Sequence, residues 1–161
     1  MTSISLTVNG SDVCLDVGAS ARLVDTLRGH LGLHGSKPAC RQGGCGACTV
    51  LVDGEAVYSC LTYSSSLDGA DVETIEGIRD TDVGRRLVGA FADADALQCG
   101  ACTPGQIVSA AVLLRSRTGG EASTELLDRQ TVVEQLVGNL CRCGCYNAIG
   151  DAVLAADADG R

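Results

Sequence analysis

The stretch Cys40-Arg-Gln-Gly-Gly-Cys-Gly-Ala-Cys48 brings three cysteines together with the spacing Cys-x4-Cys-x2-Cys, and Cys60 follows after eleven intervening residues. Glycine adopts positive φ easily and lets backbone N–H groups approach a bound group closely. The glycines among the cysteines therefore predict a loop that folds round one side of such a group and presents three sulfur atoms to it. Four cysteines with this spacing are typical of a plant-type [2Fe–2S] site.

Two other uses of these four cysteines stay open. A structural zinc site is one, although such sites usually combine two short Cys-x2–4-Cys or His elements. A disulfide network is the other, although ten cysteines in 161 residues are fewer than a disulfide scaffold normally has. We expect Cys40, Cys45, Cys48 and Cys60 to be iron ligands.

A second set of four cysteines lies further along the chain. Cys99-x2-Cys102 is separated by thirty-eight residues from Cys141-x-Cys143. This spacing is less specific, and a Cys-x-x-Cys pair also occurs in thioredoxin-type dithiols, which follow a strand in a βαβ unit. The pattern before Cys99 contains no such strand. Thr103-Pro104 predicts a helix start directly after Cys102, where the positive end of the helix dipole stabilises thiolates. We expect a second metal site here.

The first half of the chain has the period of strands. Alternating apolar residues surround Asn9-Gly10, which is a strong signal for a two-residue hairpin turn, and Asp53-Gly54 gives a second hairpin. A helical stripe over residues 21–31, capped by Ser20, separates them. The expected strands cover residues 4–8, 13–17, 49–52, 55–58 and 71–75. This half predicts a small sheet packed on a helix.

The second half has the period of helices. The expected helices cover residues 82–91, 104–117, 126–137 and 147–156, with Thr103 as the cap of the second helix and a break at 118–121. The fold class is therefore α+β, with a β-rich domain over residues 1–77 and an all-α, four-helix domain over 78–161. Each domain contains one cysteine quartet.

Composition and charge limit the partners. The formal net charge of −8 argues against binding to nucleic acid or to anionic membrane surfaces. The first residues lack a signal-peptide pattern, and no apolar run approaches eighteen residues. Clustered cysteines in a reducing compartment bind metal more often than they form disulfides. We expect a cytoplasmic protein.

Stretches in both halves of the chain resemble sequences of one known protein family. Residues 37–54, Lys-Pro-Ala-Cys-Arg-Gln-Gly-Gly-Cys-Gly-Ala-Cys-Thr-Val-Leu-Val-Asp-Gly, look like the ferredoxin-like segment of the molybdenum hydroxylases, and residues 23–33 look like the helix before it. That family includes xanthine dehydrogenase, aldehyde oxidoreductases, aerobic carbon monoxide dehydrogenase and bacterial N-heteroaromatic hydroxylases. Residues 98–105 and 138–143 resemble the family's helical [2Fe–2S] domain. The resemblance covers about residues 3–156.

The resemblance implies both a fold and a role. It implies a β-grasp, plant-type ferredoxin-like domain followed by a helical [2Fe–2S] domain. The chain would be the iron–sulfur small subunit of a heterotrimer, with FAD on a medium subunit, molybdopterin and molybdenum on a large subunit, and a dimer of heterotrimers as the assembly. It would relay single electrons from molybdenum to FAD while the large subunit hydroxylates a substrate with oxygen from water. By resemblance, Gln98 and Cys143 lie against the molybdopterin.

Other interpretations are kept beside this one. A free-standing two-cluster ferredoxin is the main alternative, and a zinc-stabilised interaction module is another. Spacing alone does not exclude that Gln98 is an ordinary surface glutamine. The substrate stays open among an N-heterocycle, a purine, an aldehyde, CO and an acyl-CoA thioester.

One position departs from the family pattern. The family usually has Cys-Arg-Cys-Thr-Gly-Tyr, whereas this chain has Cys141-Arg-Cys-Gly-Cys-Tyr146. Cys145 is therefore a possible competitor of Cys143 as a ligand. We expect Cys99, Cys102, Cys141 and Cys143 to form the second site.

Overall fold

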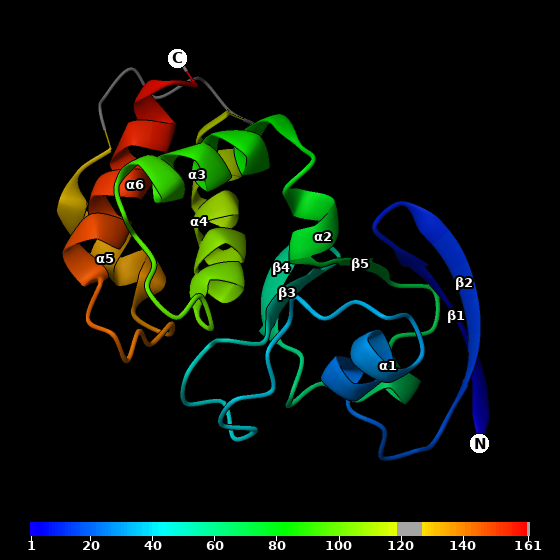
Figure 1. Ribbon diagram of the computed structural model, residues 1–161. Coiled ribbons are helices and arrows are strands. Elements are labelled where there is room, and N and C mark those ends of the chain that lie inside the picture. Colours follow the sequence, from blue (N-terminus) through cyan, green and yellow to red (C-terminus); the bar gives the residue numbers. More distant parts are fainter. Residues whose placement is uncertain (119–126, 161) are drawn as a thin grey trace.

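The computed structural model describes residues 1–118 and 127–160, and its first half is a sheet that curves around one short helix (Figure 1). The strands are β1 (Thr2–Val8), β2 (Ser11–Val17), β3 (Thr49–Val52), β4 (Glu55–Tyr58) and β5 (Asp71–Glu73). The sheet order is β2-β1-β5-β3-β4. Strands β1 and β5 are parallel, and the other neighbours are antiparallel. The predicted hairpins and the predicted small sheet packed on a helix are confirmed, and the sheet is mixed.

Both hairpins turn at the predicted dipeptides. Asn9 and Gly10 have φ values of 51° and 77°, and Asp53 and Gly54 have values of 51° and 84°. Positive φ at both central residues is the requirement of a type I′ turn, whose twist matches that of the strands.

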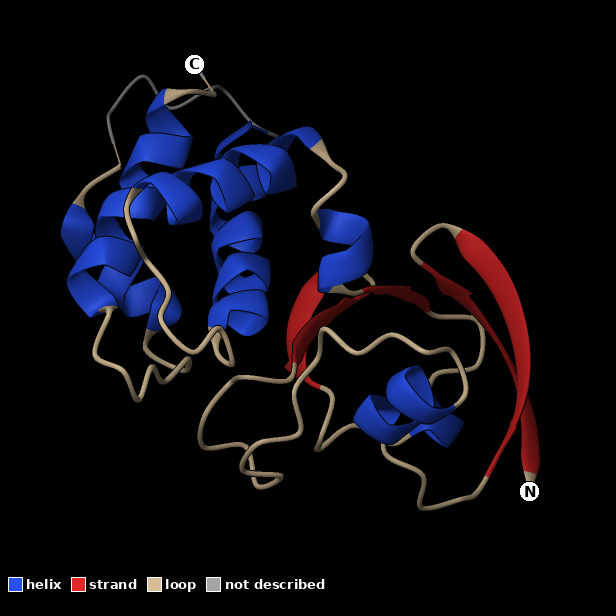
Figure 2. Cartoon of the chain, in the orientation of Figure 1, coloured by secondary structure: helices blue, strands red, loops and turns tan. Residues whose placement is uncertain are grey.

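The helix of this half is shorter than predicted, and its predicted cap is wrong. Helix α1 covers Leu23–Gly29 and has no side-chain cap, so Ser20 does not fill that role. The N–H of Val24 instead donates to the carbonyl of Ser59 at 3.1 Å. A long-range backbone contact therefore does what a local cap usually does. Figure 2 shows α1 on the concave face of the sheet.

The second half is helical, as predicted. The helices are α2 (Ile75–Ile78), α3 (Asp82–Asp93), α4 (Thr103–Thr118), α5 (Arg129–Leu136) and α6 (Tyr146–Ala158). The short helix α2 is an addition to the four predicted ones. Residues 119–121 of the predicted break and residue 126 lie outside the described residues. Within the described part of the chain, no helix has the length and apolarity that crossing a membrane requires.

Helix α4 begins one residue earlier than its sequence suggests. Thr103 is already helical, so Pro104 is the second residue of the helix and not the first. The carbonyl of Cys102 accepts the first helical hydrogen bond from Gln106 N at 3.0 Å. Helix α4 therefore begins directly after Cys102, the second cysteine of the Cys99–Cys102 pair.

The cores are built from aliphatic side chains, as the composition requires. The helical core includes Leu87, Val108 and Ile149, together with Phe91, which is the only phenylalanine of the chain and is 1% exposed. A separate cluster between α1 and the sheet includes Leu27. Aliphatic side chains bury less apolar area than aromatic ones, so each core alone provides modest stability. Contacts between the two halves add to that stability.

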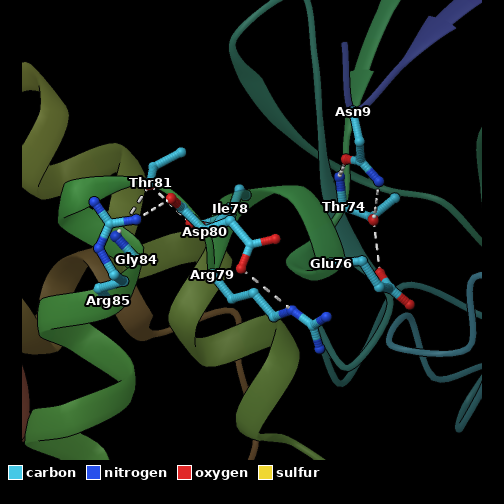
Figure 3. A network of polar contacts seen from close by, with 9 residues as sticks. All are labelled: Asn9, Thr74, Glu76, Ile78, Arg79, Asp80, Thr81, Gly84 and Arg85. Atoms are coloured by element: carbon cyan, nitrogen blue, oxygen red, sulfur yellow. Dashed lines mark hydrogen bonds and ion pairs between the residues drawn. The ribbon is translucent and has the colours of Figure 1, made fainter. Parts of the chain in front are cut away.

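A polar network joins the first hairpin to the segment between the two halves (Figure 3). The Asn9 side chain exchanges two hydrogen bonds with Thr74, accepting from its N–H at 2.8 Å and donating to its hydroxyl at 2.9 Å. The Thr74 hydroxyl donates to Glu76 at 2.6 Å. Further on, Thr81 caps α3 by accepting from Gly84 N at 3.1 Å. These bonds fix the direction in which the chain leaves the sheet.

Two candidate iron–sulfur sites

The loop of the first cysteine quartet lies between α1 and β3 and depends on left-handed backbone positions. Gly43 and Gly46 have φ values of 77° and 66°, as expected of glycines in such a loop. Arg41 also has a positive φ, 54°, which is uncommon for a residue with a side chain. Its guanidinium donates two hydrogen bonds, of 2.8 and 3.0 Å, to the Asp25 carboxylate on α1. This bidentate ion pair holds the loop against the helix.

The four thiols of this quartet have different environments. Cys48 and Cys60 are 2% and 3% exposed and pack against Val24, and burial raises the pKa of Cys48 to about 11. Cys40 lies at the open side of the loop, where a hydrogen bond from the backbone N–H of Gln42 lowers its pKa to about 7. Backbone N–H groups aimed at sulfur are the donors that stabilise thiolate ligands.

The second quartet combines two segments that are distant in the sequence. Cys99 and Cys102 precede α4, and Cys141 and Cys143 come from the loop between α5 and α6. Burial raises the pKa of Cys102 to about 12, whereas the N–H of Ala101 lowers the pKa of the exposed Cys99. This site therefore also has a buried side and an open side.

The eight predicted ligands contact one another in pairs. The pairs are Cys40–Cys45, Cys48–Cys60, Cys99–Cys143 and Cys102–Cys141. Among the described residues, no three His, Cys, Asp or Glu side chains converge as they would around a single metal ion. A [2Fe–2S] cluster takes two protein ligands on each of two irons, so paired thiols fit it, whereas a mononuclear zinc site needs four ligands around one point.

Cys145 occupies a different position from the pairs. It is buried in the helical core at the N-terminus of α6, and its thiol contacts that of Cys141, whereas Cys143 contacts Cys99. Burial opposes ionisation of Cys141, but the backbone N–H of Cys145 donates to its sulfur and, with other donors, lowers its pKa. This arrangement supports Cys143 over Cys145 in the predicted set, and Cys145 contributes a backbone donor.

The backbone conformation at residue 144 explains why glycine suits this position, where the family usually has threonine. Gly144 has a φ of 81°, and its backbone N–H donates to the carbonyl of Cys141 at 3.2 Å. A threonine with the same φ would be strained because its β-branch crowds the backbone.

The two cysteine sites are neighbours in space, although they belong to different halves of the chain. The N–H of Leu140 donates to the carbonyl of Cys45 at 2.9 Å. An open cavity of about 500 Å³ is lined by Cys45 from the first site and by Cys102 and Cys141 from the second, with Arg142 at its wall. Free space, paired thiols and N–H donors on sulfur together fit two adjacent clusters.

Asn139 is a buried residue of this region whose role the sequence did not indicate. It is 4% exposed, and its side-chain amide donates to the carbonyl of Gly46 at 3.0 Å and accepts from the Ser109 hydroxyl at 2.8 Å. From sequence, Asn139 only follows the predicted helix over residues 126–137 and lies within the stretch that resembles the family. The asparagine joins the first cysteine loop to α4 and to the second loop.

Gln98 and Cys143 are both accessible from the surface, Gln98 being exposed and Cys143 partly exposed. Gln98 is exposed and precedes Cys99, whose thiol contacts that of Cys143. Their contact with molybdopterin stays a prediction.

Comparison with families of known proteins covers both halves. The chain matches the 2Fe-2S iron-sulfur cluster binding domain over residues 6–75 and the [2Fe-2S] binding domain over residues 74–154.

Individual proteins are similar over almost the whole chain. The aldehyde oxidoreductase iron-sulfur-binding subunit of Escherichia coli K12 is 39% identical over 93% of this chain and 69% of its own length. The nicotine 6-hydroxylase small subunit of Paenarthrobacter nicotinovorans is 42% identical over 98% of this chain and 90% of its own.

Solved structures give the same result. Quinoline 2-oxidoreductase from Pseudomonas putida 86 matches with a TM-score of 0.83 and 37% identity, covering 99% of this chain and 97% of the matched one. The aldehyde oxidoreductase of Desulfovibrio desulfuricans matches with a TM-score of 0.90 and 39% identity over all of this chain, which spans only 17% of that longer chain. The predicted fold and the two domain types are confirmed, and the chain belongs to the molybdenum hydroxylase family as one of its [2Fe–2S] iron–sulfur small subunits.

Proposed function

We propose that this chain is the electron-transfer subunit of a heterotrimeric molybdenum hydroxylase, in which it relays single electrons from a molybdopterin centre to FAD. The molybdopterin would be on a large subunit, the FAD on a medium subunit, and the assembly a dimer of heterotrimers. Relatives described as small subunits, such as those of nicotine 6-hydroxylase and nicotinate dehydrogenase, support a role within a multi-subunit oxidoreductase. The chain itself would carry out no bond chemistry.

The proposed ligands are the eight paired thiols. Cys40, Cys45, Cys48 and Cys60 would hold the first cluster, and Cys99, Cys102, Cys141 and Cys143 the second. When bound, the clusters supply carriers for one electron each. The residues of the chain hold them in place and direct backbone N–H groups at the sulfurs, which sets their potentials together with burial.

The single observation that carries this proposal is the hydrogen bond between Leu140 and Cys45, because it joins the two sites directly. A relay needs two carriers at short distance, whereas two independent structural sites need no contact. Gln98 and Cys143, at the open side of the helical site, are proposed to face the molybdopterin. Cys40, at the open side of the loop site, would then face the FAD.

The reaction of the whole enzyme is proposed as hydroxylation of a substrate carbon with oxygen from water. Among the relatives, the printed names include nicotine, nicotinate, caffeine and aldehyde. We propose an N-heterocycle, an aldehyde or a similar compound for this protein, with specificity determined by the large subunit. We also propose a cytoplasmic location, which the two clustered sets of cysteines support, and a domain boundary after residue 77.

Purification of the native complex tests this proposal. We expect a complex of three polypeptides that contains iron, acid-labile sulfide, FAD and molybdenum, and that reduces a dye with one of the candidate substrates. A monomer with iron but without FAD and molybdenum would instead support a free-standing two-cluster ferredoxin. Zinc in place of iron in native material would overturn both redox interpretations.

A further inference from the structure

The backbones of the two cysteine sites meet at glycines. A Cβ atom built on Gly105, in the first turn of α4, would lie 2.3 Å from the carbonyl oxygen of Gly46 in the first cysteine loop. A Cβ atom on Gly46 would lie 2.4 Å from the carbonyl oxygen of Gly138, which precedes the second loop. These distances are shorter than any side chain tolerates. The loops approach one another as closely as their backbones permit.

Asn139 lies at the centre of this contact with its polar groups bonded. Its amide nitrogen donates to the carbonyl of Gly46 at 3.0 Å and to the hydroxyl of Thr49 at 3.3 Å. Its side-chain oxygen accepts from Ser109 at 2.8 Å, and its backbone carbonyl accepts from Gln106 at 2.9 Å. One side chain therefore connects the loop of the first site, helix α4 and the loop of the second site.

We propose that Asn139 is a positioning residue that fixes the separation between the two cysteine sites, and that the contact of Gly105 with Gly46 permits this close approach. The proposal rests on the proposed function only in that both sites hold clusters. Asn139 is 4% exposed, so it lies inside the chain and not at its surface. It acts through the backbone of the residues beside the ligands Cys45 and Cys141.

The chemistry of asparagine suits this position. The site presents the Gly46 carbonyl, which needs a donor, and the Ser109 hydroxyl, which donates. Asparagine is the small side chain that offers both a donor and an acceptor from one rigid plane. Aspartate has the same shape but only acceptor oxygens when ionised, so it would face the Gly46 carbonyl with repulsion.

Asn139→Asp in the full chain with both clusters loaded is the first test. Electron paramagnetic resonance of the fully reduced chain detects magnetic coupling between two reduced clusters, and dipolar coupling falls with the cube of their separation. We expect the coupling to weaken in the variant while the iron content stays at about four atoms per chain. Thr26→Val is the matched control, because Thr26 is also buried and its hydroxyl bonds to that of Ser64, a pair in which neither Asn139 nor Gly46 takes part.

Gly105→Ala approaches the same contact from the opposite side. An added methyl group in helix α4 favours the helix locally, so any weakening of the coupling has to come from pushing the Gly46 carbonyl away. Gly89→Ala is the control, since Gly89 lies within α3 and has open space around its Cβ position. We expect weaker coupling in Gly105→Ala and unchanged coupling in Gly89→Ala.

If a variant loses a cluster, magnetic coupling can no longer be measured. Hydrogen exchange at the amide of Leu140 then reports whether the contact between the two loops is intact. Because this amide bonds to the first loop, loosening the contact by 1–2 kcal/mol accelerates its exchange by roughly 5- to 30-fold. The positioning role is overturned if both Asn139→Asp and Gly105→Ala leave the magnetic coupling unchanged. In a variant that has lost a cluster, unchanged exchange at the Leu140 amide counts as the same result. Absence of iron from the unmodified chain overturns the proposed function instead, so the two failures are distinguishable.

Discussion

The N–H of Leu140 donates a hydrogen bond of 2.9 Å to the carbonyl oxygen of Cys45. Leu140 directly precedes Cys141, so one hydrogen bond and a few covalent bonds connect a proposed ligand of the first site to one of the second. This is the shortest bonded connection that the described contacts provide between the two halves of the relay. The contact consists of backbone atoms, so the side chain of residue 140 takes no part in it.

Replacing Leu140 with its α-hydroxy analogue removes this N–H and keeps the side chain. We expect slower redistribution of an electron between the two clusters after rapid reduction, and a loss of about 1 kcal/mol in the free energy of unfolding. Leu140→Ala is the control and should transfer electrons at the rate of the unmodified chain, because this side chain is 52% exposed. Equal electron-transfer rates in the α-hydroxy variant and in Leu140→Ala would contradict a role of this hydrogen bond in electron transfer between the clusters.

The two cysteines that compete for the second site differ in their contacts, so their variants should differ too. Cys143→Ala removes the partner of Cys99, and we expect iron to fall from about four to about two atoms per chain. Cys145→Ala keeps the backbone N–H that bonds to Cys141, and we expect it to retain about four. Iron and acid-labile sulfide per chain are the measurements. Full cluster content in Cys143→Ala, with loss in Cys145→Ala, would reverse the assignment.

Much of the fold could be predicted because its signals are local. Asn9-Gly10 and Asp53-Gly54 require only their own φ values to form hairpin turns. The spacing of Cys40, Cys45 and Cys48 is likewise local, and by itself it is typical of a [2Fe–2S] site. Family resemblance added the role of Gln98 and made the second quartet more specific, since the spacing of that quartet alone is a weak signal.

The missed features depend on contacts between distant residues. Ser20 failed as a cap because the start of α1 bonds to the segment before Cys60. The role of Asn139 depends on the Gly46 carbonyl, which is ninety-three residues away. Arg41 adopts a positive φ beside a carboxylate on α1. A local pattern contains no record of such partners, so the sequence indicated the ligands of the site but not the residues that position them.

The ion pair between Arg115 and Glu73 connects α4 to β5. It has two hydrogen bonds, of 2.7 and 2.8 Å, and the side chains are 31% and 27% exposed. We expect Arg115→Met or Glu73→Gln to lower the free energy of unfolding by about 1–2 kcal/mol, because the pair is bidentate and only partly screened by solvent. Urea unfolding of the cluster-loaded chain measures this loss.

A double-mutant cycle separates this pair from other contacts of its members. The coupling energy of Arg115→Met with Glu73→Gln should account for most of the loss. Arg85→Met is the control, since Arg85 pairs with Asp82, one turn away on the exposed surface of α3, and should change the urea midpoint little. A coupling energy near zero would show that the pair does not join the halves energetically.

The carboxylate of Glu76 predicts a pH dependence of stability. Burial opposes its ionisation, but hydrogen bonds from the Thr74 hydroxyl at 2.6 Å and from Gly35 N at 2.7 Å, with the charge of Arg79, hold its pKa below the usual value of 4.5 (Figure 3). A lowered pKa in the folded state means that the unfolded chain binds the proton more readily. The stabilisation is therefore complete above pH 4.5 and is lost as the pH falls through the lower, folded-state pKa.

Glu76→Gln removes this titration while it keeps the size of the side chain. We expect the unmodified chain to be more stable than the variant at pH 7, and the difference in urea midpoint to shrink as the pH falls below about 4.5. Comparing the two chains at each pH cancels the acid sensitivity that they share, including that of any bound cluster. Glu55→Gln, at the exposed start of strand β4, is the control for removing one carboxylate from the chain. A constant difference for Glu76→Gln would mean that its hydrogen bonds, and not its charge, provide the stabilisation.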